Sequence, residues 1–177
     1  MTTIWTLPTI ISQYDEPGAP VDDEMSNVAW DDSSNFQELL NIGNSLLTKK
    51  NLQHIARSPK YDLRNNTYFI SLSGFNFVNL PNILSGISLK VTANRRGRIS
   101  DDTIQLSLNG ELIGDNYAGT NLDPIQIYGS STDLWKTNLT ITDIKNPEFG
   151  VILRFRAHPK WPHSDGMYLD AVELQIS

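Results

Sequence analysis

Residues 104–113 constrain the fold more than any other part of the sequence. They are Ile-Gln-Leu-Ser-Leu-Asn-Gly-Glu-Leu-Ile, two runs of alternating apolar and polar residues joined by Asn109 and Gly110. Both central positions of a type I′ turn need a positive φ, which Asn and Gly adopt at low cost. The segment therefore predicts a tight antiparallel hairpin that buries one face and leaves the other in water.

The same period of two recurs along the rest of the chain. Alternating or apolar runs occur at 67–73, 87–93, 124–128, 149–156 and 167–176. Their predicted inward residues are Tyr68, Ile70, Leu72, Ile87, Leu89, Val91, Ala93, Val151, Leu153, Phe155, Val172, Leu174 and Ile176. About seven short strands separated by turn residues are typical of an antiparallel β-sandwich or jelly roll. We therefore expect an all-β fold.

The N-terminal segment differs from the rest of the chain. Prolines and a glycine separate its short apolar pieces, and two acidic runs follow. This pattern predicts an extended N-terminal arm at 1–34, attached to a β-sandwich domain at 35–177. The aromatic residues of the arm, Trp5, Tyr14 and Trp30, would form a sticky patch in solvent. We expect them to contact this domain, a neighbouring subunit or a glycan.

Two further segments carry expectations of their own. Near-helical spacing of apolar residues at 36–47 predicts a short helix, although Gly43 weakens it. In the loop at 157–166, Pro159 and Pro162 hold Trp161 between them, and a stiff loop that presents an aromatic side chain suits a contact surface. We expect Trp161 to contact either a neighbouring subunit or its own domain.

Charge and composition limit the classes of function. The chain has 177 residues, a formal net charge of -6 and no cysteine, which excludes disulfides and thiolate sites. Phosphate-backbone binding needs clustered Lys and Arg, and the one basic cluster, Arg95, Arg96 and Arg98, is expected to be a solvated loop. We therefore expect no nucleic acid as a partner. We expect no membrane either, because no apolar segment approaches the roughly 20 residues of a membrane span. Residues 1–8 lack the basic and apolar runs of an export signal, so we expect the chain to be made in the cytoplasm without a targeting signal.

Few residues are arranged for chemistry. His158 and His163 match no zinc-ligand spacing and are expected to lie in a solvated loop. The acidic pair Asp101 and Asp102 precedes a predicted strand and is expected to close a turn, with loop-borne Ca²⁺ binding as the minor alternative. The sequence has no nucleophile elbow, phosphate loop or metalloprotease motif. We expect no enzyme activity, no cofactor and no bound metal.

Residues 128–135, Tyr-Gly-Ser-Ser-Thr-Asp-Leu-Trp, form the most distinctive motif of the chain. Gly129 allows a sharp turn after Tyr128, and Asp133 can accept backbone N–H bonds in an Asx turn. Leu134 and Trp135 can plug the end of a sandwich. The motif therefore predicts a role in turn formation and core packing rather than in catalysis.

The order of segments from residue 66 to 177 gives this motif a wider context. It is followed by Leu139-Thr140, Asp143-Ile144 and Phe149-Gly-Val151. The series resembles a module of tail, neck and fibre-associated structural proteins of tailed bacteriophages. In those proteins a Tyr-Gly-Gly-Ser-x-Asp-Leu-Trp-Gly sequence leads to an Asp-Ile segment and a Phe-Gly-Val strand. Here Ser130 and Lys136 stand in place of two of the glycines.

This resemblance implies a non-enzymatic structural component of a virion, located in the tail, neck, fibre or capsid decoration. Its expected partners are other virion proteins and copies of itself in a homo-oligomer. The alternative is a glycan-binding β-sandwich module of a phage fibre or adhesin that binds a host-surface glycan. In that case Trp135, Trp161, Tyr128 or Tyr117 would provide stacking platforms.

Overall fold

The computed structural model describes residues 2–16, 30, 66–96, 99–119, 123–157 and 166–177. In chain order the elements are β1 (Ile10–Tyr14), β2 (Phe69–Ser73), β3 (Ile87–Arg96), β4 (Ile99–Leu108), β5 (Glu111–Ile113), β6 (Ile125–Ser130), α2 (Ile141–Ile144), β7 (Phe149–Ala157) and β8 (Gly166–Ile176). The predicted helix at 36–47, the domain boundary at residue 34, and Trp161 with its neighbouring histidines lie outside the described residues.

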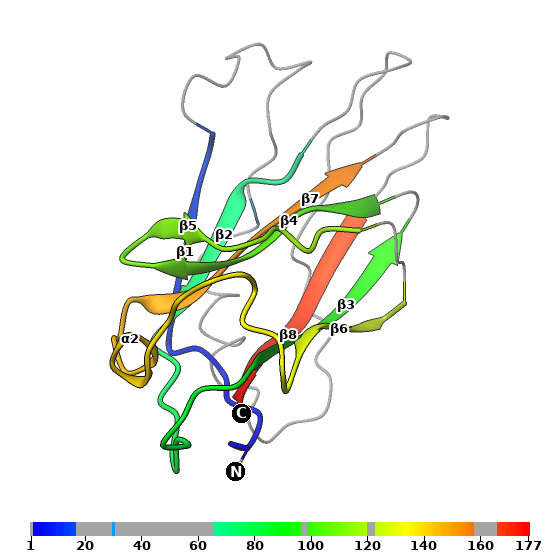
Figure 1. Ribbon diagram of the computed structural model, residues 1–177. Coiled ribbons are helices and arrows are strands. Elements are labelled where there is room, and N and C mark those ends of the chain that lie inside the picture. Colours follow the sequence, from blue (N-terminus) through cyan, green and yellow to red (C-terminus); the bar gives the residue numbers. More distant parts are fainter. Residues whose placement is uncertain (1, 17–29, 31–65, 97–98, 120–122, 158–165) are drawn as a thin grey trace, which may run out of the picture.

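The strands form two antiparallel sheets (Figure 1). One sheet has five strands in the order β1-β2-β7-β4-β5, and the other has three in the order β6-β3-β8. Every strand pair in both sheets is antiparallel. The described part of the chain is therefore mostly antiparallel β with almost no helix, which is consistent with the predicted all-β fold.

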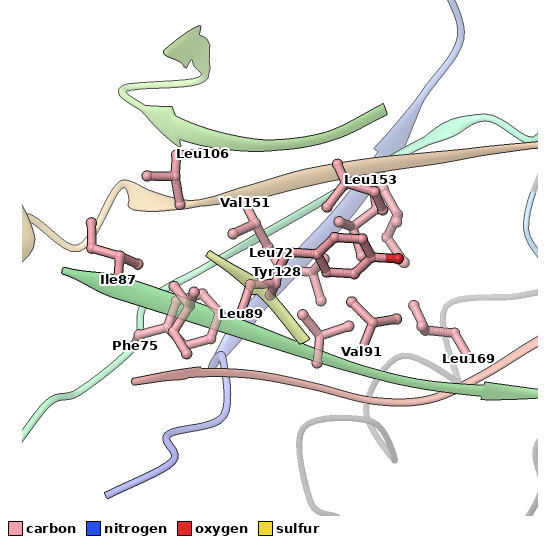
Figure 2. Packing of buried hydrophobic residues seen from close by; sticks show 14 of the residues in the cluster. Leu72, Phe75, Ile87, Leu89, Val91, Leu106, Tyr128, Val151, Leu153 and Leu169 are labelled. Carbon is pink, nitrogen blue, oxygen red and sulfur yellow. The ribbon is translucent and has the colours of Figure 1, made fainter. Parts of the chain in front are cut away.

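A single apolar core takes side chains from both sheets. All of the predicted inward residues are buried except Tyr68, which is only partly buried against the core. Figure 2 shows Leu89 and Val91 of β3 together with Val151 and Leu153 of β7 in this cluster. Alternation places successive strand side chains on opposite faces, so each of these runs contributes one face to the core.

Two local elements are fixed by residues close in sequence. Asn109 and Gly110 have φ values of 54° and 81°, and they join β4 to β5 in the hairpin predicted from the sequence. Helix α2 begins at a capping box, in which the Thr140 hydroxyl accepts a bond from the Asp143 N–H and the Asp143 carboxylate accepts one from the Thr140 N–H.

Residues 2–16 take part in both sheets. The N–H groups of Thr3 and Thr6 donate to the carbonyls of Ile176 and Leu174, each at 2.8 Å, so this stretch runs along the edge of β8. The chain then forms β1, which pairs with β2 at the edge of the five-stranded sheet. The described part of the predicted arm therefore docks on its own domain, the first of the alternatives expected for its aromatic residues.

Two predicted loops are strands in the structure. Arg95 and Arg96 belong to β3 and pair with β8, so the expectation of a solvated loop is wrong for both. Asp101 and Asp102 lie inside β4, where the register shifts between Asp101 and Thr103, so the predicted turn is also wrong. A β-bulge absorbs one extra residue in a strand, which explains how two adjacent acids fit there.

Among the glycines of the described residues, Gly150 leaves the least room for a side chain. A Cβ built on it would lie 1.9 Å from the Leu72 carbonyl oxygen, whereas one on Gly110 would meet nothing within 4 Å. We expect Gly150→Ala to lower the free energy of unfolding by about 3 kcal/mol because backbone must shift. Gly110→Ala should cost about 1 kcal/mol, since only its positive φ is strained. Equal losses in chemical denaturation would contradict this account.

Candidate functional site

Trp135 is the centre of the motif at 128–135. Its side chain is fully buried, and its Nε1 donates to the Ile87 carbonyl at 2.9 Å. Gly129 lies within β6 with a φ of 69°, and a Cβ on it would be 2.5 Å from that Nε1. The absence of a side chain at Gly129 therefore makes room for the indole against β3.

Asp133 fixes the backbone on either side of this indole. One carboxylate oxygen accepts the Trp135 N–H and the other accepts the Tyr117 hydroxyl, each at 2.8 Å. The Asp133 carbonyl also accepts the N–H of Ile87 at 2.9 Å. The hydrogen bond to Asp133 is the main reason that the pKa of Tyr117 rises to about 12. The phenol therefore keeps its proton, and with it this hydrogen bond, to a higher pH than an unperturbed tyrosine would.

The Tyr117 ring completes the cluster. Its centroid lies 4.4 Å from that of Trp135, and the Trp135 carbonyl accepts the Asp115 N–H at 2.9 Å. Leu134 is partly buried, and its carbonyl accepts the N–H of Thr137 at 2.9 Å. The cluster thus ties the loop after β6 to β3 and to the segment after β5. The polar groups of Tyr117, Asp133 and Trp135 bond to other groups of the protein, as expected for a structural cluster, and we call this cluster the Trp135 plug.

A second cluster, not anticipated from the sequence, centres on Asp102. Arg154 and Arg156 of β7 both donate to its carboxylate, and Arg154 also pairs with Glu16 at 2.9 Å. The side chains of Asp102 and Arg154 are only 7% and 12% exposed. Arg156 donates in addition to the Asn66 side chain at 3.2 Å. The bulge in β4 therefore places a carboxylate between two arginines.

An aromatic pair continues this charged cluster across the sheet. Tyr14 of β1 is stacked on Phe69 of β2 at 5.2 Å between centroids. The Arg154 guanidinium lies 4.2 Å from the centre of the Phe69 ring, a cation–π geometry. Burial raises the pKa of Tyr14, Glu111 adds to this rise, and Arg154 opposes it. A row from Tyr14 to Asp102 thus crosses four strands.

The two buried aspartates of the bulge have different roles. Asp102 holds the arginines of β7, whereas Asp101 accepts the Tyr128 hydroxyl at 2.6 Å. Tyr128 belongs to β6 of the three-stranded sheet, so this hydrogen bond joins the two sheets. The sequence carried a signal for both, because adjacent acids interrupt an alternating strand, but their partners are more than 25 residues away.

The remaining predicted contact residues lie apart from one another. Trp5 is partly buried under Lys90, whose Nζ lies 4.5 Å from the ring centre. Tyr14 is 39% exposed on the five-stranded sheet. Trp30 is a core residue at 3% exposure, and its Nε1 donates to the Tyr68 carbonyl. Of these three described residues, Tyr14 is therefore the most accessible.

The described residues include no group of three or more His, Cys, Asp or Glu side chains placed to hold a metal ion. Within the same part of the chain, no helix has the length and apolar character needed to cross a membrane.

Comparisons of the chain with protein-family models, with curated proteins and with solved structures find no match.

Trp135→Phe tests the plug. The change leaves the Ile87 carbonyl without its buried donor and removes part of the ring, which together should cost about 3 kcal/mol of unfolding free energy. Trp5→Phe is the matched control, because Trp5 is only partly buried, and it should cost less than about 1 kcal/mol. Urea denaturation of both variants measures the difference, and similar losses would count against the plug.

Asp102→Asn tests the charged cluster. The substitution keeps the shape of the side chain but leaves two arginines facing a neutral group, at an expected cost of about 3 kcal/mol. Asp115→Asn is the control, because it breaks an ion pair with Lys136, whose side chain is 79% exposed. Such surface pairs contribute less than about 1 kcal/mol. Comparable unfolding free energies for the two variants would refute the structural role of Asp102.

Proposed function

We propose that this chain is a non-enzymatic structural component of a tailed-bacteriophage particle, made in the host cytoplasm and located in the virion. It would serve in the tail, neck, fibre or capsid decoration, in contact with other virion proteins and with copies of itself. The observation that carries the proposal is the ordered resemblance of residues 66–177 to such proteins, which is strongest at residues 128–135.

The use of that segment supports the proposal. The hydrogen bonds and packing contacts of this segment are made within the protein, by Trp135, Asp133 and Gly129. A segment with this role stiffens a scaffold, and stiffness is what an assembly module needs to hold its neighbours in register. The proposal assigns these residues to the architecture of the module rather than to a reaction.

We further infer that the two sheets stack as a β-sandwich of the jelly-roll kind. Support comes from the single core that both sheets share and from the Tyr128–Asp101 hydrogen bond between them. In this proposal the N-terminal segment, whose described residues bond to both sheets, also serves for anchoring or subunit contacts. In a symmetric assembly each contact is repeated many times, so contacts that are weak individually together hold the particle.

Particle purification tests the virion role directly. Particles are isolated by density-gradient centrifugation from an infected or induced culture that carries the gene, and their proteins are quantified by mass spectrometry. We expect the chain to co-purify with the particles in a constant ratio to the major capsid protein. An abundant soluble host protein serves as the contamination control. Recovery of the chain only in particle-free fractions would contradict the proposal.

One surface favours the second candidate, a glycan-binding module. Trp135 and Tyr128 are buried and offer no stacking platform, and Tyr117 packs on Trp135. Tyr14, however, is partly exposed above Phe69 and beside the charged groups of the Asp102 cluster. Carbohydrate sites combine an aromatic face with polar groups of this kind.

A glycan array decides between the two candidates. If the module binds a glycan through this surface, Tyr14→Ala should abolish the signal while Ile83→Ala, at a loop residue that is 80% exposed, leaves it intact. If the wild-type chain binds no glycan on the array, the second candidate is rejected.

A further inference from the structure

Strand β6 forms one edge of the three-stranded sheet, because its order is β6-β3-β8. Within the described part of the chain, β6 pairs only with β3. Its outward side chains Ile125 and Ile127 are both 59% exposed, whereas Gln126 and Tyr128 face inward and are buried. An exposed apolar edge strand is a template for pairing with another strand.

The other sheet edges are guarded in the ways that proteins commonly use. Residues 3–6 run along the end of β8, from Leu174 to Ile176, and the rest of that strand carries Asp170 and Glu173. Strand β5 has only three residues and begins with Glu111. Strand β1 is followed directly by Asp15 and Glu16. Short length, charge and coverage each discourage edge pairing.

As far as the described residues show, strand β6 lacks all three protections. It has six residues, and the chain carries no charged side chain from residue 124 to residue 132. None of the backbone hydrogen bonds recorded outside the strand ladders involves Ile125, Ile127 or Gly129. By comparison with the other edges, β6 is therefore the one that is suited to a partner.

Alternation of the antiparallel ladder shows which backbone groups of β6 point away from β3. The Pro124 carbonyl accepts the Ala93 N–H at 2.8 Å, so it points towards β3. The N–H and C=O of one residue point to the same side of an antiparallel strand, and successive residues alternate. Gln126 and Tyr128 therefore bond to β3, while Ile125 and Ile127 direct both backbone groups to the open edge.

We propose that β6 pairs antiparallel with β6 of a second copy of this chain, about a two-fold axis that passes through Gln126. This register sets Ile125 opposite Ile127 of the second copy, and Ile127 opposite its Ile125. The four free N–H groups and four carbonyls of these residues then bond to one another. The four isoleucine side chains form one apolar stripe on the outer face of a continuous six-stranded sheet.

A second copy fits this edge because the sequence Ile125-Gln126-Ile127 is symmetric about Gln126, so the isoleucines of one strand meet those of the other. The chain has 20 acidic and 14 basic residues, so its net charge opposes self-association and contact between two copies requires a neutral surface. The β6 edge is neutral, and in the proposed register the flanking Asp123 lies opposite Gly129 rather than opposite the second Asp123. No like charges are therefore opposed along the paired strands.

The register follows from the strand itself. Centring the axis on Ile127 would set Ile125 opposite Gly129, whose φ of 69° distorts the ladder and which has no side chain to pack. Centring it on Gln126 uses only regular strand residues and pairs isoleucine with isoleucine. Both the hydrogen bonds and the apolar contacts favour this second arrangement.

Two six-residue strands bury less than the roughly 1,200 Å² of a standard stable interface. The dimer should consequently be weak and concentration-dependent in solution, with a dissociation constant of about 10 µM or more. Its formation does not depend on the virion role, so self-association and co-purification with particles are separate tests.

Sedimentation velocity over a concentration series tests the proposal. We expect reversible dimerisation of the full chain, and Ile127→Lys should weaken it at least about tenfold by placing a charge on the edge. Ile83→Lys is the matched control, because Ile83 is 80% exposed outside the strands, and it should dimerise as the wild type does. Circular dichroism checks that both variants are folded. A monomer at every concentration, or equal dimerisation of both variants, would overturn the proposal.

Engineered thiols test the register, since the chain has no cysteine of its own. Directly opposed residues have Cα atoms about 5.5 Å apart, within reach of a disulfide, whereas diagonal neighbours are about 7 Å apart. A mixture of Ile125→Cys and Ile127→Cys proteins should therefore form mixed disulfide dimers in preference to either variant alone. Equal yields from all three samples would reject pairing about Gln126.

Discussion

Burial of one apolar face from each sheet in a shared core is the interaction on which the rest of this structure depends. The strands supply that face through alternation, so Leu89 and Val91 from one sheet meet Val151 and Leu153 from the other. Apolar burial has no direction, and by itself it would let the sheets slide. The Tyr128–Asp101 hydrogen bond supplies direction, because it joins one residue of β6 to one residue of β4.

The ends and outer surfaces of the fold are secured by more specific contacts. The Trp135 plug closes the loop after β6 against β3, and it needs Gly129 because any side chain there would occupy the place of the indole. On the other sheet, Asp102 fixes two arginines of β7, and Arg154 in turn reaches Glu16 just beyond β1. These contacts hold the N-terminal segment to the domain.

Edge protection connects the fold to assembly. Coverage of β8 by residues 3–6 and the acidic residues beside β1 and β5 leave β6 as the neutral edge. In the proposed virion role, contacts between copies are expected to be specific in register yet weak individually, since symmetry then decides when they form. A short strand with two exposed isoleucines fits that requirement.

The sequence alone determined the antiparallel, all-β character, the inward faces and the Asn109-Gly110 hairpin, because each depends on residues a few positions apart. Alternation and turn preference are local properties, so they can be recognised before any partner strand is known. Only the tertiary structure decided that Asp101 and Asp102 form a bulge and that Trp30 is a core residue. It also decided that β6 is an edge strand among the strands that the structure describes. Each of these depends on which distant strand lies alongside. The alternation of apolar and polar residues in one strand does not specify which other strand will pair with it.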